Sequence, residues 1–447
     1  MRTSRKKLGL SALAVGLLST VSIAISPNAT GSSVRSSNVS AASEDATEEE
    51  LWQDAPVTFI AWLEEHYEVA GGYVQAELDY ASRTVIIGWQ EGHTVPAEVG
   101  ERADELGFNL IVRPVPGSRA QTEEIATKVL RVLREKYPEL ATPSVALPSL
   151  ENDGFEIRGD LQGGKSTVDF LSEISGSGDF AFVKAPIRFT ESNEKQEPLA
   201  RQHPVEGARS APASFILPLA TRTLDTSPYN AGGFITRYAD GFRYICSNAF
   251  GLRINGYTRT TTAEHCSRQD YASYGGGAAY GTSYVPSSSA AGRVLSASAS
   301  PLVFHGDRLT STKRTVIGWV SPIKGQLLCT GGGNSGTHCS LRVRDDGVVY
   351  PPVEGASHDW TGWKISSDDS SVVGAAEGDS GGPVLRRING NFSEVLASGM
   401  IQSGLGERIC PALNYKYTDP PHRCVHTVTI SRFSTLGSGA GGTLVTG

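Results

Sequence analysis

The chain has 447 residues, of which 39% are hydrophobic and 19% charged, so it can bury a core and has room for roughly two to four domains. Its 50 glycines and 23 prolines favour many turns and short elements over long helices. The net charge of -7 gives no reason to expect a nucleic-acid partner. Residues 211–447 carry 20 Lys and Arg against 16 Asp and Glu, whereas residues 1–210 carry 20 against 31, so the two halves could attract each other.

The N-terminus has the pattern of an export signal. Basic residues at positions 2–7 precede an apolar stretch from Leu8 to Ile25, and Ser22-Ile23-Ala24 offers the small residues that a signal peptidase reads. We expect residues 1–29 to hold a signal peptide and the start of a leader, and the protein to be secreted to the extracellular space. A membrane anchor is the alternative, but the stretch is short for a span of about 20 residues and contains several serines. No later segment is apolar enough, so we expect no stable membrane anchor.

Residues 30–210 form a first region with helical and strand patterns in alternation. A polar leader over residues 26–50 is followed by a small α+β domain. Apolar spacing predicts helices over 51–67, 95–106 and 122–137, a strand pair over 72–89 and a strand over 109–115. We interpret residues 138–148 as a linker, 154–157 and 180–187 as strands, and 191–212 as an exposed, cleavable connector.

Residues 211–447 have a different sequence pattern from residues 30–210, and this pattern predicts an all-β domain. Short alternating runs at 234–237, 316–319, 341–349 and 394–401 are separated by Gly, Ser, Asn and Asp turns. Such spacing indicates a sandwich or a barrel. Residues 274–299 are dominated by small side chains, and we interpret them as long surface loops.

All six cysteines lie in this second region, and an even number in an exported chain suggests three disulfides. Six cysteines allow about 15 pairings. Sequence proximity favours Cys246–Cys266, Cys329–Cys339 and Cys410–Cys424. A zinc site is the competing interpretation, but no C-x2-C pair occurs, and we expect no metal and no other cofactor.

The segment Glu377-Gly378-Asp379-Ser380-Gly381-Gly382-Pro383 is the most informative part of the sequence. A serine nucleophile needs an exposed hydroxyl and backbone N–H groups that can hold an oxyanion, and flanking glycines permit the sharp turn. An ordinary Asp-Ser-Gly-Gly turn would look the same by composition. His265, in Thr262-Ala263-Glu264-His265-Cys266, adds a general base beside a cysteine that can pin its loop.

These two segments resemble the chymotrypsin-like serine peptidases, and most closely the bacterial branch that includes α-lytic protease. The C-terminal Gly442-Thr443-Leu444-Val445-Thr446-Gly447 is also similar to the end of that protease. The resemblance covers roughly residues 220–447 and implies two antiparallel β-barrels with the active site between them. It further implies a polypeptide substrate and a secreted serine endopeptidase that is a monomer.

The resemblance assigns a role to each matching residue. Ser380 would attack the scissile carbonyl while His265 takes its proton, and the Gly378 and Ser380 N–H groups would form the oxyanion hole. Asp379 would be structural, and Cys246–Cys266 would brace the histidine loop. Ser403 and Gly404 would pair with the substrate backbone. Gly374 would lie where trypsin-like members carry Asp, so we expect small or apolar side chains in the pocket rather than Lys or Arg.

The third member of the triad departs from the family pattern. The family places an Asp just before a short apolar strand, but the matching segment of this chain, residues 300–304, begins with Ser300. Asp307 is the nearest carboxylate, and we weigh it as the triad acid against an ordinary turn residue. Asp270 lies too close to His265 in sequence. Glu264 is a second departure, because the family normally has a small residue there. A catalytically impaired homologue that acts as a binding module is therefore the alternative function.

The first region fits the same family. Residues 51–138, with Ala70-Gly71-Gly72-Tyr73-Val74 leading into a strand, loosely resemble the pro-region of α-lytic-like proteases, which assists folding and inhibits until it is removed. All-β folds with long-range contacts form slowly, so a folding template has a physical use. We expect a zymogen whose partner is its own pro-region. A stable accessory domain is the alternative.

Overall fold

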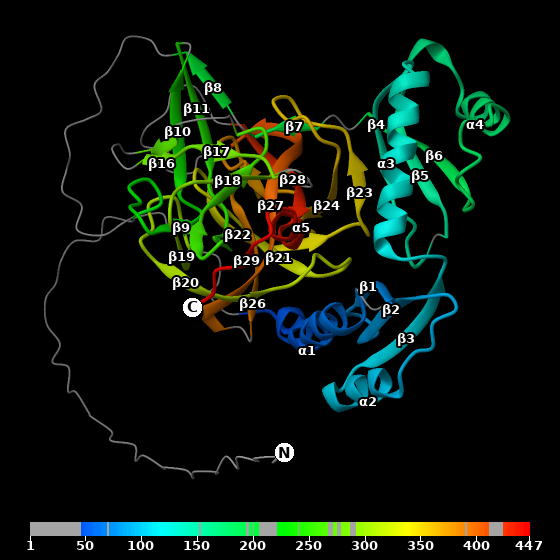
Figure 1. Ribbon diagram of the computed structural model, residues 1–447, viewed down its shortest axis with the longest axis horizontal. Coiled ribbons are helices and arrows are strands. Elements are labelled where there is room, and N and C mark those ends of the chain that lie inside the picture. The colour runs from blue at the N-terminus through cyan, green and yellow to red at the C-terminus, as the bar shows by residue number, and fades with distance from the viewer. Residues whose placement is uncertain are drawn as a thin grey trace, which may run out of the picture. The chain divides into compact units, whose positions relative to one another are not determined.

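The computed structural model describes residues 46–68, 71–151, 153–193, 196–199, 201–204, 221–239, 241–266, 271–274, 279–286, 292–388, 391–410 and 423–447. The expected signal peptide, most of the leader and Asp270 lie outside these residues. A small α+β region precedes a C-terminal region built mostly of strands, as predicted (Figure 1). Among the described residues, no helix is both long and apolar enough to cross a membrane.

The first part of the chain is a three-stranded sheet covered by helices. Its elements are α1 (Glu48–Leu63), which continues as a short π-helical turn (Glu64–Glu68), β1 (Tyr73–Asp79), β2 (Thr84–Gln90), α2 (Ala97–Leu106) and β3 (Asn109–Val115). Thr47 and Glu50 form a capping box at the start of α1. β1 and β2 form a hairpin, and α2 carries the chain back so that β3 runs parallel to β2. Phe59, Ile60 and Leu63 of α1 are fully buried in this core, and the predicted elements are confirmed.

A second layer follows, with α3 (Arg119–Lys136), β4 (Leu140–Ala146), β5 (Phe155–Leu161), a 3-10 turn (Gln162–Gly164), α4 (Thr167–Gly176) and β6 (Ile187–Glu191). α3 lies along the sheet formed by β4, β5 and β6 (Figure 1). The predicted linker over 138–148 is wrong, because β4 pairs with β5 and buries Leu140 and Val145. The strand expected at 180–187 begins only at its last residue, and α4 was missed.

The described residues of the C-terminal region form many strands and one helix. Its elements are β9 (Tyr229–Ala231), β10 (Phe234–Ala239), β11 (Phe242–Ser247), β12 (Leu252–Ile254), β13 (Tyr257–Arg259), β14 (Thr261–Ala263), β15 (Tyr271–Ser273), β16 (Ala279–Gly281), β17 (Ser283–Tyr284), β18 (Gly292–Leu295), β19 (Ala299–Phe304), β20 (Lys313–Trp319), β21 (Leu327–Gly332), β22 (Gly336–Val343), β23 (Val348–Tyr350), β24 (Trp360–Ser366), β25 (Ala375–Ala376), β26 (Pro383–Ile388), β27 (Asn391–Ile409), β28 (Arg423–Arg432), α5 (Phe433–Gly439) and β29 (Thr443–Leu444).

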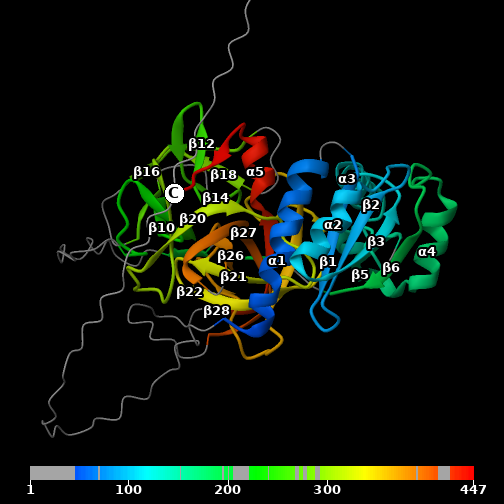
Figure 2. The ribbon, with the colours of Figure 1, turned by 90° about the horizontal axis from the view of Figure 1, so that it is seen from below.

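Three disulfides tie these strands together, with the pairing that sequence proximity favours: Cys246–Cys266, Cys329–Cys339 and Cys410–Cys424. The interpretation of residues 274–299 as surface loops is wrong in part, because β18 lies there, is buried and pairs with β14 and β17. β21, β22, β26 and β27 lie side by side in one sheet (Figure 2). The strand pairing leaves the sheets open, so the two expected barrels do not close.

Strand pairing also joins the first region to the C-terminal region. β4 pairs antiparallel with β23, which makes β4, β5 and β6 part of the large C-terminal sheet. Gln53 of α1 adds two hydrogen bonds, donating to the Gly325 carbonyl at 3.1 Å and accepting from the Leu327 N–H at 2.8 Å. Two ion pairs lie in the same contact, Arg386 with Asp54 at 2.9 Å and Arg387 with Glu50.

The connector is exposed at residues 191 and 193, as predicted, but part of its described chain is paired or buried. Its described residues include β7 (Glu197–Pro198), which pairs with β27, and β8 (Arg201–Pro204), which pairs with β11. Leu199, between the two strands, is only 1% exposed. Backbone pairing with the C-terminal sheets overrides the polar composition of the segment.

Candidate active site

Ser380 lies in a tight turn between β25 and β26. Gly378 and Gly381 on either side of it have φ angles of 92° and 82°, which only glycine adopts without strain. A Cβ on Gly381 would meet the Thr262 hydroxyl at 2.2 Å and the Ser247 carbonyl at 2.4 Å, so the turn is pressed against the strands that precede His265. The glycines of this motif are therefore required by the backbone path as well as by access to the serine.

Asp379 holds the turn from inside, in the structural role that the sequence predicts. Its Oδ1 accepts from the N–H groups of Asn334 and Ser335 at 2.8 and 3.0 Å, and its Oδ2 accepts from the Ala376 N–H at 2.7 Å and from the Ser335 hydroxyl. Burial raises the pKa of this carboxyl, while these hydrogen bonds oppose the change. The positive charge of buried Arg222 acts on Asp379 as well.

His265 follows β14 and is brought against Ser380 by the fold. Its Nε2 lies 2.7 Å from the Ser380 Oγ, and the Cys246–Cys266 disulfide fixes the next residue to β11. Both side chains are buried, with His265 7% and Ser380 0% exposed. Burial first, and then the charge of Arg293, lowers the pKa of His265 to about 4, so the ring is neutral at pH 7 and can accept the serine proton.

The structure does not join Asp307 to His265. The Nδ1 of His265 is buried and has no hydrogen-bond partner among the described residues. Asp307 is exposed in the turn between β19 and β20, where its carboxylate accepts from the Leu309 N–H at 2.9 Å. The expectation that Asp307 orients His265 is corrected accordingly: this carboxylate caps its own turn. Ser300, at the start of the apolar strand, donates to the Asn230 Oδ1 at 2.8 Å.

Glu264 contacts a loop of the C-terminal region through its buried carboxylate. Its buried Oε1 accepts from the Ser357 N–H at 3.0 Å and lies 2.8 Å from the His358 Nδ1. The same loop brings Gly355 so close that a Cβ there would lie 3.5 Å from the Cβ of His265. Glu264 thus anchors a loop of the C-terminal region over the histidine.

Three of the groups expected to bind substrate contact the chain itself. The Gly378 N–H, one of the two expected oxyanion donors, donates to the Leu199 carbonyl at 2.5 Å. Ser403 and Gly404 pair antiparallel with Pro198 and Glu197 of β7. Ser380, the other expected donor, follows Gly378 by two residues in the same turn, and its Oγ also lies 3.4 Å from the Gln402 carbonyl.

Gly374, the position expected to line the specificity pocket, lies against β28. Its N–H donates to the Val425 carbonyl at 2.8 Å, and a Cβ would meet the His426 carbonyl at 2.5 Å. No side chain could replace it without moving the backbone. Among the described residues, no group of His, Cys, Asp and Glu is arranged to hold a metal ion.

Comparison with known proteins gives a similarity of fold. No protein-family model matches the chain, and no curated protein matches it. Solved structures do match. The Thermobifida fusca protease A matches at 23% identity, covering 49% of this chain and 98% of its own, with a TM-score of 0.34. The chymotrypsin of Cellulomonas bogoriensis matches at 19% identity and a TM-score of 0.32, with coverage of 49% and 98%.

An α-lytic protease homologue, N4, matches at 17% identity, covering 48% of this chain and 97% of its own, with a TM-score of 0.33. Each of these three solved structures matches about half of this chain.

Sequence reasoning missed Leu199, Arg293 and Val425, which all contribute to the site. Arg293 donates to the Glu264 carbonyl at 2.6 Å and brings its charge near His265. Val425 packs so closely on Gly404 that a Cβ there would lie 2.5 Å from a Val425 methyl. Only Leu199 carries a local signal, as an apolar residue within a polar connector.

Proposed function

We propose that the protein is a serine-type endopeptidase that is exported and made as a zymogen. The observation that carries the proposal is the 2.7 Å contact between the His265 Nε2 and the Ser380 Oγ, in a turn whose Gly378 N–H already donates to a peptide carbonyl. A neutral histidine, a buried hydroxyl and an aligned backbone donor are the three groups that acyl transfer from a peptide requires.

The reaction uses these groups in order. Ser380 attacks the substrate carbonyl as His265 takes its proton, and the Gly378 and Ser380 N–H groups stabilise the oxyanion. His265 then gives the proton to the leaving amine, and water hydrolyses the acyl-enzyme by the same steps. Removal of one oxyanion donor typically costs about 10²–10³ in rate.

We infer that His265 works without a carboxylate on its Nδ1. In enzymes with a complete Ser-His-Asp triad, replacing the aspartate that orients the histidine lowers turnover by about 10⁴. Here the disulfide at Cys266 and the loop anchored by Glu264 fix the position of His265 instead. The pKa of about 4 makes the histidine a weak base, so we expect slow turnover compared with a complete triad.

The domain organisation belongs to the same proposal. Residues 1–29 would direct export, residues 30–210 would form a pro-region, and residues 211–447 would be the peptidase domain. The paired strands β4 and β23 and the buried ion pairs of α1 support a pro-region that assists folding and inhibits the site. The substrate would be a polypeptide, and removal of the pro-region would yield a secreted, disulfide-bonded enzyme.

A binding module without activity is the second candidate, and the unpartnered Nδ1 of His265 is the observation that favours it. Hydrolysis of unfolded casein separates the two. The secreted wild-type protein should release peptides, and the Ser380→Ala and His265→Ala variants should each lose at least about 10³ of that rate. Equal rates in all three proteins would refute the proposal.

A further inference from the structure

We infer that residues 196–199 and 201–204 are bound as a substrate and that the peptide bond after Leu199 is the one that the enzyme cleaves in its own chain. The inference rests on the proposed function and adds the scissile bond and the side chain preferred before it. It starts from the hydrogen bond between the Gly378 N–H and the Leu199 carbonyl at 2.5 Å. This donor lies two residues before Ser380, so it marks the carbonyl that the serine faces.

The backbone on both sides of Leu199 is held as a substrate would be. Upstream, Pro198 pairs with Ser403 and Glu197 with Gly404, and the Ser403 hydroxyl donates to the Gln196 Oε1 at 3.0 Å. Downstream, β8 pairs antiparallel with β11, the strand that ends beside Cys246. An extended chain that adds a strand to exposed sheet edges is a general mode of peptide recognition.

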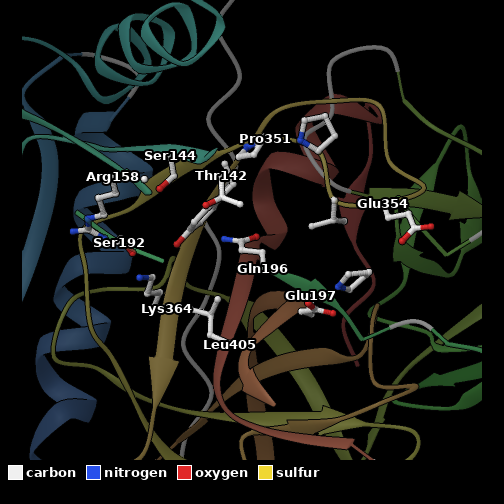
Figure 3. Close-up of a pocket in the computed structure, with 15 residues that line it drawn as sticks. Thr142, Ser144, Arg158, Ser192, Gln196, Glu197, Pro351, Glu354, Lys364 and Leu405 are labelled. Carbon is white, nitrogen blue, oxygen red and sulfur yellow. The ribbon is translucent and has the colours of Figure 1, made fainter. Parts of the chain in front are cut away.

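The residues before Leu199 line a partly open groove. A cavity of about 250 Å³ beside them is lined by Thr142, Ser144 and Arg158 of the first region and by residues 350–354, Lys364 and Leu405 of the C-terminal region. Figure 3 shows Gln196 and Glu197 among these side chains. The first region supplies one wall of the groove, so its departure after cleavage would open that side to other peptides.

The pocket for Leu199 is apolar and of limited depth. Leu199 is 1% exposed and belongs to the buried cluster that includes Ala375, Ile401, Val425 and Val428. Val425 closes the space beside Gly404, and the His426 carbonyl closes the space at Gly374. A branched aliphatic side chain is buried here without a charged partner, so a Lys, Arg or Glu side chain would lose its hydration with nothing in return.

The cleavage is a hydrolysis that consumes one water molecule. The Ser380 Oγ bonds to the Leu199 carbonyl carbon, its proton moves to the His265 Nε2, and the Leu199 C–N bond breaks as the proton passes to the new amine. Water then attacks the ester, which leaves a carboxylate on Leu199 and restores Ser380. The new C-terminus at Leu199 and the new N-terminus at Ala200 refine the boundary proposed near residue 210.

The experiment determines both ends of the processed full-length chain by intact mass and terminal sequencing. Wild type should give one fragment that ends at Leu199 and one that begins at Ala200. Ser380→Ala should stay uncleaved, and Leu199→Asp should be processed at least about 100-fold more slowly. Leu309→Asp is the matched control, because Leu309 is 55% exposed outside the groove, and it should be processed like wild type.

Preference is measured on the processed enzyme with the chromogenic peptides Gln-Glu-Pro-Leu, Gln-Glu-Pro-Lys and Gln-Glu-Pro-Glu. The kcat/KM for the peptide that ends in Leu should exceed the values for the peptides that end in Lys and Glu by at least about 100-fold. Cleavage of the chain at another bond, cleavage of the Ser380→Ala chain, or normal processing of Leu199→Asp would overturn the inference. An enzyme that hydrolyses casein but cuts its chain elsewhere overturns the inference alone, whereas an inert wild type overturns the proposed function with it.

Discussion

Glu50→Ala tests how strongly the first region is held to the C-terminal region. Glu50 pairs with Arg387, and their side chains are only 4% and 8% exposed. Loss of one partner of a buried ion pair typically costs about 3–5 kcal/mol, because the other charge stays buried with fewer compensating contacts. Glu50 also accepts from the Thr47 N–H at 3.0 Å in the capping box, and its removal adds about 1 kcal/mol.

The assay is urea unfolding of the full chain in the Ser380→Ala background, which prevents self-cleavage. Glu50→Ala should lower the free energy of unfolding by about 4–6 kcal/mol in all, from the pair and the cap together. Glu48→Ala is the matched control on the same helix, because Glu48 is 79% exposed in its pair with Arg83, and it should cost under about 1 kcal/mol. Equal losses in the two variants would refute the reasoning that burial of the pair fixes its strength.

Three further predictions concern the site and the interface. Asp307→Asn should leave the rate of casein hydrolysis within about twofold of wild type, because the side chain caps its own turn; a loss near the 10⁴ of the triad template would return Asp307 to the triad. Gly404→Ala should raise KM more than it lowers kcat on the Gln-Glu-Pro-Leu peptide, because the added Cβ would lie within 2.9 Å of three Val425 atoms and displace the strand that pairs with substrate; an unchanged KM would contradict this. Burial raises the pKa of Glu64 to about 7, so the stability that its protonated form contributes is complete below pH 4.5 and is lost as pH rises through 7. Glu64→Gln should therefore stabilise the Ser380→Ala chain at pH 8 by up to about 3 kcal/mol and change little at pH 4, and a difference independent of pH would refute that assignment.

Local chemistry made the centre of the site predictable. The glycines around Ser380 are needed for the turn wherever it occurs, and a cysteine next to His265 has few partners nearby in sequence. The strand over 109–115 is β3 residue for residue, because its boundaries are set by turns on either side. Features of this kind depend on a few consecutive residues, which a sequence displays directly.

Features that depend on distant partners were not predictable in the same way. β4 holds a Thr-Pro-Ser run typical of a linker, and it becomes a strand because β5 and β23 supply its hydrogen bonds. Leu199 lies in a polar segment and is buried because β27 pairs with the two residues before it and the Gly378 N–H binds its carbonyl. The position of Asp307 follows from the turn between β19 and β20, so proximity in sequence to the apolar strand gave no information about His265.

The most direct test of the central claim is covalent labelling of Ser380. The processed wild-type protein is incubated with an aryl phosphonate at pH 8, where His265 is neutral, and the modified residue is located by peptide mass mapping. The account predicts one label per chain, on Ser380, and no label in His265→Ala over the same time. A processed wild-type protein that takes up no phosphonate on Ser380 would contradict it.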